Sequence, residues 1–242
     1  PKKPMGIFQV FEGGGAMPYS FLHIAAMRND VGRAKVLIEG GAKDDIHIWD
    51  GMPKKPMFLE VIPVDQRDAA GWTPLMCAAT HGHLEMCKLL IDMKADLNSR
   101  KNFSVASIHL ACRGGHRKVV ELLLENQADF MINKLDESLP IHDAAFGGHT
   151  DVVRLLLATR GGQFKSAMLK HVNDTGQTCL HSAAKGGHPE TVHALLALGA
   201  ATGTKDLKGR FPHDVAKGRR TFMAFPGGDD PLNAEFREAH VA

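Results

Sequence analysis

Histidine and cysteine are the residue types in this sequence with the greatest chemical potential. The chain has 242 residues, among them 14 histidines and four cysteines. Histidine acts as a metal ligand and as a general acid or base near neutral pH, and a cysteine thiolate is a strong nucleophile. Whether these residues form a site depends on their spacing.

The cysteines do not have the spacing of metal ligands. They are Cys77, Cys87, Cys112 and Cys179, none of them in a C-x-x-C pair, and each lies in an apolar, helical-looking stretch. This pattern predicts small buried hydrophobes in a reducing compartment, the alternative being a disulfide or zinc framework. Cys179 and His181 suggest a thiol nucleophile with a base, but both belong to a motif that the chain repeats. We expect a buried structural thiol at Cys179.

Other motifs for catalysis are absent from the sequence. There is no phosphate loop, no G-x-S-x-G elbow and no H-E-x-x-H pair. Gly13-Gly14-Gly15 lacks the Lys-Ser/Thr pair that a phosphate loop needs, so a flexible linker is expected there. The sequence predicts a non-enzyme with no metal and no cofactor.

The composition is that of a globular protein and excludes several classes of function. Apolar residues make up 44% and charged residues 23% of the chain, and the formal net charge is +2. Neither this charge nor the 6% of aromatic residues favours nucleic-acid binding. The sequence has no apolar stretch long enough to span a membrane, and its first residues do not resemble a signal peptide. We expect a cytoplasmic protein, with the nucleus as an alternative.

A repeat accounts for most of the histidines. Gly-His pairs begin at Gly82, Gly115, Gly148 and Gly187, with separations of 33, 33 and 39 residues. A frame such as Thr178-Cys-Leu-His-Ser-Ala-Ala precedes the pairs, and an apolar run such as Val119-Val-Glu-Leu-Leu-Leu follows them. A weaker copy of the frame begins at Ser20 and a degenerate one at Gly209. The repeat leaves six histidines unexplained, and none of the six has ligand spacing.

This pattern resembles the ankyrin-repeat family. The resemblance implies an all-α solenoid of about six repeats, each with a β-turn or hairpin loop and two antiparallel helices, in one domain over residues 1–242. It also implies that the motif histidines hydrogen-bond backbone and capping groups. Regular repeats are expected at 68–100, 101–133, 134–172 and 173–205, with an atypical first repeat at 15–67 and a degenerate capping repeat at 206–242.

Helix signals support this fold independently of the resemblance. Thr73 and Thr178 are good N-caps, and Pro74 suits the first turn of a helix. The glycines of the Gly-His pairs stand where a short helix must end in a left-handed residue.

Two insertions lengthen the period and are expected in loops between repeats. One lies at 46–65 and the other around 161–170. The segment Pro-Lys-Lys-Pro-Met occurs at 1–5 and again at 53–57. Either this is coincidence or a shared solvated turn, or residues 7–11 and 58–62 pair as short strands.

The surface expected to bind partners flanks the repeated motif. In the ankyrin family, the loop tips and the inner side of the first helices form a concave face. Apolar residues predicted on adjacent repeats of this face would form a patch for a partner protein, unless the 46–65 insertion covers it. The expected contact residues are Trp72, Thr80, His81, Phe103, Val105, Arg113, Leu135, Ser138, Phe146 and Gln177.

The third and fourth repeats also depart from the helix and turn signals of the others. The turn glycine is replaced by Ser104 and Glu137, and the capping threonine by Ala106 and Leu139. Each lost cap costs about 1 kcal/mol, and a non-glycine residue at positive φ a similar amount. These repeats either give up stability for a particular surface or have drifted.

Basic residues gather in the last unit, at 205–220. This segment is expected to be the solvated outer side of a capping repeat, and docking of an acidic segment is the alternative. Taken together, the sequence predicts a non-catalytic, monomeric scaffold or adaptor that binds partner proteins. The alternative is a recognition module of a larger enzyme or signalling protein.

Overall fold

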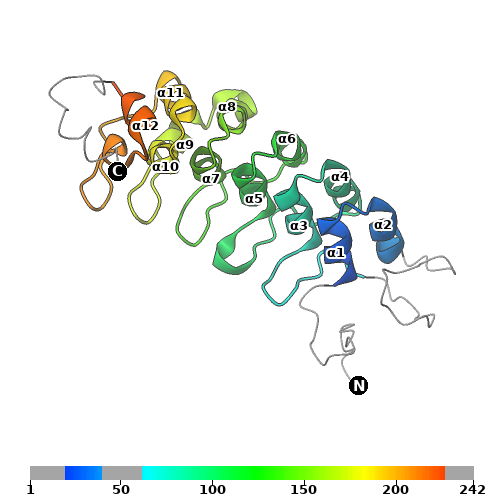
Figure 1. The fold of residues 1–242 in the computed structure, drawn as a ribbon. Helices are drawn as coiled ribbons and strands as arrows, with labels where there is room; N and C mark the ends of the chain where they lie inside the picture. Colours follow the sequence, from blue (N-terminus) through cyan, green and yellow to red (C-terminus); the bar gives the residue numbers. More distant parts are fainter. Residues whose placement is uncertain (1–19, 40–61, 227–242) are drawn as a thin grey trace.

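Two layers of short antiparallel helices form an elongated stack. A computed structural model describes residues 20–39 and 62–226 (Figure 1). The first helices of successive repeats lie side by side in one layer, and the second helices lie in the other. Long loops project from one side of the first layer. This is the helical solenoid that the sequence predicts, with five helix pairs and a shorter final unit in the described part of the chain.

Each of the first five repeats contributes one helix to each layer. The first helices are α1 (Phe21–Met27), α3 (Pro74–His81), α5 (Ser107–Arg113), α7 (Pro140–Phe146) and α10 (Cys179–Gly186). The second helices are α2 (Val31–Glu39), α4 (Leu84–Asp92), α6 (Arg117–Glu125), α8 (Thr150–Ala158) and α11 (Pro189–Ala197). The final unit consists of a 3-10 turn, η3 (Pro212–Val215), and α12 (Arg219–Met223).

Capping residues set the ends of the first helices, largely as expected. The Thr73 hydroxyl accepts a hydrogen bond from the Met76 amide at 3.3 Å, as an N-cap does. The Thr178 hydroxyl instead lies 2.9 Å from Nδ1 of His181. All four glycines of the Gly-His pairs have the predicted positive φ, between 71° and 83°.

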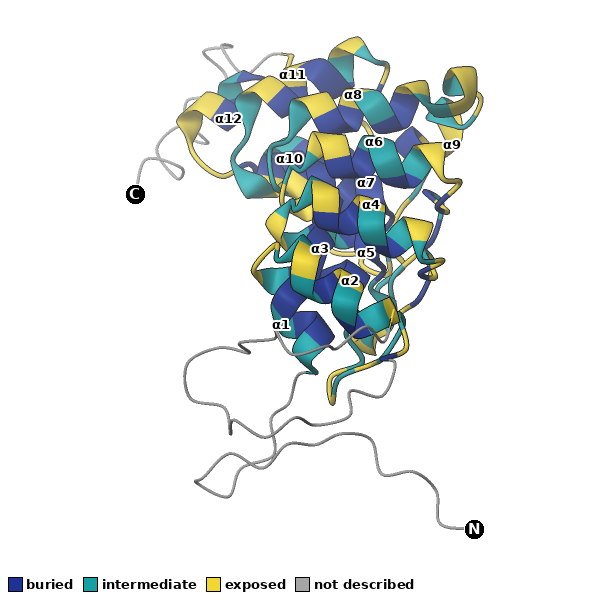
Figure 2. Cartoon of the chain, turned by 90° about the vertical axis from the view of Figure 1, so that its right-hand side faces the viewer, coloured by how far each residue is buried: buried dark blue, intermediate teal, exposed yellow. Residues whose placement is uncertain are grey.

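The core is continuous along the stack and lies between the two layers. Alanine pairs of the first helices, such as Ala78-Ala79 and Ala183-Ala184, are fully buried and let adjacent repeats approach closely. The second helices contribute one apolar stripe each, and in α6 this stripe contains Val119, Val120 and Leu123. In the second helices, exposed residues alternate with buried ones, as one apolar stripe per helix requires (Figure 2).

The insertion around 161–170 is not a plain loop. It contains η2 (Thr159–Gly162) and a short helix, α9 (Lys165–Lys170). Met168 and Leu169 are buried, and the ring of Phe164 contacts the ring of Phe130 edge-on at 5.4 Å between centroids. These apolar contacts add packing to the stack and explain why the segment folds as a helix.

Other expectations fall outside the described residues. They concern Gly13–Gly15, the Pro-Lys-Lys-Pro-Met segments, the pairing of 7–11 with 58–62, and the bulk of the insertion at 46–65.

Candidate functional site

The loops that precede the first helices are joined to one another by backbone hydrogen bonds at their tips. The Leu135 amide donates to the Phe103 carbonyl at 2.9 Å, and the Asp174 amide donates to the Asp136 carbonyl at 3.0 Å. The Leu207 amide continues this series with the carbonyl of Thr175, at 3.0 Å. We call the surface made by these tips and the first helices the inner face.

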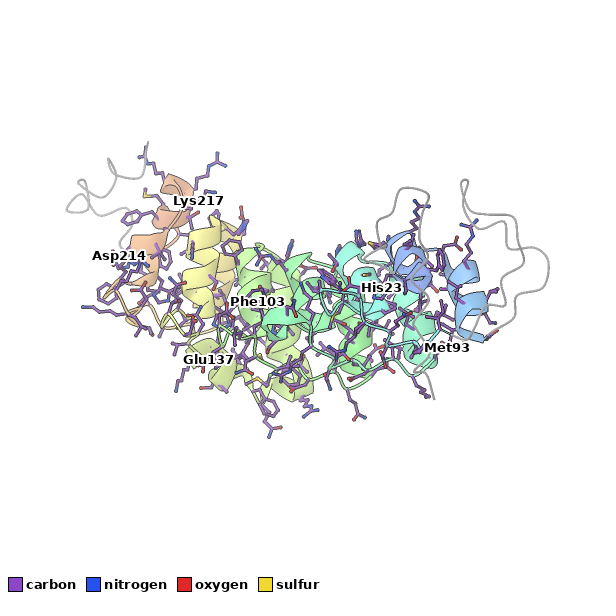
Figure 3. All side chains as sticks on the ribbon, turned by 90° about the horizontal axis from the view of Figure 1, so that it is seen from below. His23, Met93, Phe103, Glu137, Asp214 and Lys217 are labelled. Atoms are coloured by element: carbon purple, nitrogen blue, oxygen red, sulfur yellow. The ribbon has the colours of Figure 1, made fainter. Side chains whose placement is uncertain are left out.

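Two large apolar side chains are adjacent and exposed on the inner face. Phe103 is 73% exposed and Leu135 is 67% exposed, and the tip hydrogen bond places their residues next to each other. Figure 3 shows Phe103 between His23 in the first repeat and Lys217 in the last unit.

The backbone at Phe103 is strained. Phe103 has φ 63° and ψ 22° within the turn η1 (Asn102–Ser104), and Ser104 has φ 57°. Glu137, the residue expected at the glycine position of the next loop, has φ 58°. Left-handed backbone costs an L-residue about 1–2 kcal/mol because Cβ approaches the following carbonyl oxygen. The third and fourth repeats therefore hold their loops in the strained geometry that the missing glycines predicted.

An aromatic ring and a cation meet at the ends of α5 and α7. The Arg113 guanidinium lies over the Phe146 ring, 5.1 Å from its centroid, and its Nη1 is 3.3 Å from Oδ1 of Asp143. Lys134 approaches the same oxygen at 3.0 Å from the loop. Asp143 is buried, and burial raises the pKa of its carboxyl although both cations oppose that rise.

These contacts connect the loop tips to the helix ends in the third and fourth repeats. We call Phe103, Leu135, Arg113 and Phe146 the central patch. Lys134, which precedes Leu135 in the loop, binds Asp143 on α7. Asp143 in turn binds Arg113 at the end of α5. The patch thus combines exposed apolar surface with one cation, and aromatic residues and Arg are enriched in protein interfaces.

A further departure of these two repeats is found at the first position of the loop. In three other loops this position holds Asp68, Asn173 or Asp206, whose side-chain oxygens accept backbone hydrogen bonds within the loop. The third and fourth repeats have Lys101 and Lys134 instead. An alignment of the loops alone would have shown this exchange, which the sequence analysis missed.

In three loops the fifth position contacts the next loop. Lys101 lies over the ring of Trp72, with Nζ 3.9 Å from its centroid, and the Gln177 amide donates to Asp206 at 3.5 Å. The Ser138 hydroxyl accepts from Asn173 at 3.4 Å. In these three loops the side chain at this position therefore helps to stack one loop on the next.

The direction of these fifth-position side chains shows that two of the expected contact residues were misplaced. Ser138 and Gln177 are buried, with 4% and 7% of their surface exposed, so the expectation that they face solvent is wrong. Trp72 and Val105, at the same loop position, are half-buried. The periodicity identified the position but could not show which way its side chain points.

Thr80 and His81 lie at the end of α3. The Thr80 hydroxyl donates to the Met76 carbonyl at 2.8 Å, and Nδ1 of His81 is 2.8 Å from the carbonyl of Cys77. Thr80 is half-buried and His81 is exposed. Both residues border the inner face one repeat before the central patch.

The motif histidines hold repeats together through backbone carbonyls, as the resemblance implied. Nε2 of His116 is 2.9 Å from the Thr80 carbonyl, and Nε2 of His149 is 3.0 Å from the Arg113 carbonyl. At the helix starts, Nδ1 of His109 accepts the Ala106 amide at 3.3 Å, and Nδ1 of His142 accepts the Leu139 amide at 3.2 Å. His181 makes the same bond to the Thr178 amide at 3.1 Å, so this contact belongs to the motif and does not replace the hydroxyl caps that Ala106 and Leu139 lack.

Burial sets the ionisation of the chemically interesting side chains. It lowers the pKa of His109 to about 4 and that of His142 to about 4, which keeps both rings neutral at pH 7. Burial also raises the pKa of the Cys179 thiol to about 12. All four cysteines are free and buried. A thiol at Cys179 that stays protonated and inaccessible is unsuited to nucleophilic attack.

The described residues contain neither a candidate metal centre nor a helix that could span a membrane. No group of three or more His, Cys, Asp or Glu side chains in that part of the chain could hold a metal ion. Among the same residues, no helix has the length and apolar character needed to cross a membrane.

Comparison with known families agrees with the geometry. A family model described as ankyrin repeats (3 copies) matches residues 13–101 and 108–206. The chain belongs to the ankyrin-repeat family. A second model, ankyrin repeats (many copies), matches residues 79–124. A comparison with curated proteins found no match. Ankyrin repeats are in general protein–protein interaction modules.

Proposed function

We propose that this ankyrin-repeat protein is a non-catalytic scaffold that binds partner proteins on its inner face, with the central patch as the main contact. Arg113 and Phe146 supply a stacked cation and ring at the helix ends, and Phe103 and Leu135 supply apolar contact at the tips. Trp72, Thr80, His81 and Val105 flank this surface.

The combination of exposure and strain at Phe103 carries the proposal. A large aromatic side chain that is 73% exposed contributes little to the core, yet its backbone is held at φ 63°. Backbone strain clusters at functional sites, and exposed apolar patches mark interaction surfaces. The tip hydrogen bond between Leu135 and Phe103 holds this surface in shape before a partner arrives, which reduces the ordering cost of binding.

The non-catalytic part of the proposal rests on how the reactive side chains are used. The motif histidines are engaged with backbone groups, and the Cys179 thiol is protonated and buried. Free, buried thiols also suit a reducing compartment, so we place the protein in the cytoplasm or nucleus. A monomer is the simplest state for such a scaffold.

Variants at the tips test the proposal by affinity capture. Phe103→Gly removes the ring and relieves the positive φ, so Phe103→Gly/Leu135→Ser should lose bound partners without losing stability. Leu207→Ser is the matched control because Leu207 is 79% exposed on another tip. Partners retained by wild type and Leu207→Ser but lost from the double variant support the proposal. An identical set from all three baits contradicts it.

A further inference from the structure

Equivalent positions near the C-terminal ends of the first helices form a row across the inner face. Successive frames place Thr80, Arg113, Phe146 and Lys185 at this position. Helices α5, α7 and α10 pack in that order, so Phe146 lies between the repeats of Arg113 and Lys185. The Lys217 amide donates to the Ala184 carbonyl at 2.8 Å, which adds another cation beside the end of α10. We call Arg113, Phe146 and Lys185 the basic row.

The cations of the basic row have binding capacity left. The Arg113 side chain is 58% exposed, and a guanidinium has five N–H donors, of which one contacts Asp143. Lys185 is exposed. A cation near a helix C-terminus also interacts favourably with the helix dipole and so stabilises the fold. The stability of each variant must therefore be measured together with its binding.

Carboxylates near the basic row are already engaged or lie elsewhere. The Asp143 side chain is 6% exposed and binds Lys134 and Arg113. The carboxylate of Asp136 is 3.8 Å from Lys134, and it accepts the Ser138 amide. The exposed residues Glu137 and Asp174 belong to the loop tips rather than the helix ends. The helix ends therefore present positive charge around an aromatic ring.

The distance between repeats predicts how far apart the complementary residues must be in a partner's sequence. Packed helices are about 8–10 Å apart, so Arg113 and Lys185 are separated by about 16–20 Å over two repeats. An extended chain advances about 3.3 Å per residue and covers that distance in about five or six residues. A carboxylate at each end of such a segment can reach a cation while a residue midway contacts Phe146.

We propose that the basic row binds an extended acidic segment of the partner protein, with two Asp or Glu residues about six positions apart and an aromatic or aliphatic residue between them. This inference rests on the proposed function and adds the chemistry of the partner. The carboxylates pair with Arg113 and Lys185, and the central apolar side chain packs on Phe146.

A library of random 12-residue peptides displayed on phage tests the pattern with the full chain as bait. We expect enrichment of the acidic–apolar–acidic pattern. A synthetic peptide with Glu at positions 3 and 9 and Phe at position 6, labelled with fluorescein, then measures affinity by fluorescence anisotropy. Enrichment of basic or uncharged peptides, or of none, would overturn the proposal.

A charge swap identifies the contact. Lys185→Glu should weaken binding of the labelled peptide by about threefold to tenfold. A peptide with Lys in place of one of its two Glu residues should regain that affinity on Lys185→Glu only. Arg154→Glu is the matched control because Arg154 is an exposed cation on α8, in the other layer. Equal binding by wild type and Lys185→Glu, or equal loss in Arg154→Glu, would overturn the proposal.

Failure of this inference can be told apart from failure of the proposed function. If Phe103→Gly/Leu135→Ser loses a captured partner while Lys185→Glu keeps it, the scaffold binds proteins on its tips and the acidic-segment proposal is wrong. Thermal unfolding of each variant excludes loss of structure as the cause: Lys185→Glu must unfold within a few degrees of Arg154→Glu for a loss of binding to support the proposal.

Discussion

The ammonium group of Lys134 lies 3.0 Å from Oδ1 of Asp143, a carboxylate on α7 that is almost fully buried. The pair fixes the fourth loop against the helix that follows it. In three other loops an Asp or Asn anchors the loop through its own backbone, so the fourth repeat has replaced a local anchor with a longer one. The same oxygen of Asp143 also lies 3.3 Å from Nη1 of Arg113.

Removal of Lys134 should destabilise the protein because it leaves a buried carboxylate with one weaker partner. We expect Lys134→Met to lower the free energy of unfolding by about 2 kcal/mol in urea denaturation. Lys134→Met/Asp143→Leu should lie within about 1 kcal/mol of wild type, since Leu110 occupies the equivalent position in α5. A double variant no more stable than Lys134→Met would show that the buried charge is not the cause.

Glycine should relieve the strained loops. We expect Ser104→Gly and Glu137→Gly each to raise the free energy of unfolding by about 1 kcal/mol, and Tm by about 2–4 °C, because both positions have positive φ. Gly176→Ser is the opposite control: its φ is 74°, and a Cβ there would lie 2.9 Å from the Leu207 amide nitrogen. Differential scanning calorimetry measures all three. Unchanged Tm in both glycine variants would contradict the strain at these turns.

The repeat made the fold and much of the central patch predictable. A 33-residue period fixes which residues face the core, so the helix pairs, the left-handed glycines and the exposure of Phe103 and Leu135 follow from spacing. The strain at Ser104 and Glu137 also follows, because each replaces the glycine that the turn geometry favours.

Contacts between repeats were less predictable. Whether Gln177 faces solvent depends on Asp206 in the next loop, and the partner of Asp143 is nine residues earlier at Lys134. Neither contact follows from the repeated motif, which describes one unit at a time. Helix α9 was missed for a similar reason: Met168 and Leu169 are buried by packing on the stack rather than by a local helix signal.

The buried histidines should make stability depend on pH. Burial lowers the pKa of His109 and of His142 from the ordinary 6.5 to about 4, so the unfolded chain binds protons more readily between these values. Each ring therefore contributes up to about 3 kcal/mol of stability above pH 6.5, and this contribution is lost as the pH falls to about 4. Protonation of Asp143, whose pKa is raised, acts in the opposite sense.

Urea denaturation at pH 7.5 and at pH 5 measures this dependence. His109→Gln keeps a side chain able to accept the Ala106 amide but cannot titrate. We expect this variant to be less stable than wild type at pH 7.5 and to lose less stability on acidification. An equal loss in both proteins would show that His109 is not a source of the pH dependence.

The cysteines should be inert in the folded protein. Burial raises the pKa of Cys77, Cys87 and Cys179 to about 12, so few thiolates exist at pH 8. We expect iodoacetamide to label none of the four cysteines in native buffer and all four in denaturant, as mass spectrometry would count. Rapid labelling of Cys179 in native buffer would contradict its structural role and revive a catalytic one.

Close approach between repeats should make one glycine outside the turns, Gly186, costly to replace. A Cβ at Gly186 would lie 2.4 Å from the Phe146 carbonyl oxygen, which belongs to the backbone of the preceding repeat and cannot rotate away. Gly186→Ala must therefore push two repeats apart at the base of the inner face, and we expect it to lower the free energy of unfolding by about 1–3 kcal/mol. Gly203→Ala is the matched control, since nothing lies within 4 Å of a Cβ there, and it should change stability by less than about 0.5 kcal/mol. Because the displaced atom is the carbonyl of Phe146, Gly186→Ala should also weaken binding at the basic row, which urea denaturation and peptide anisotropy together would detect. Equal stability of the two alanine variants would mean that the repeats are not in such close contact.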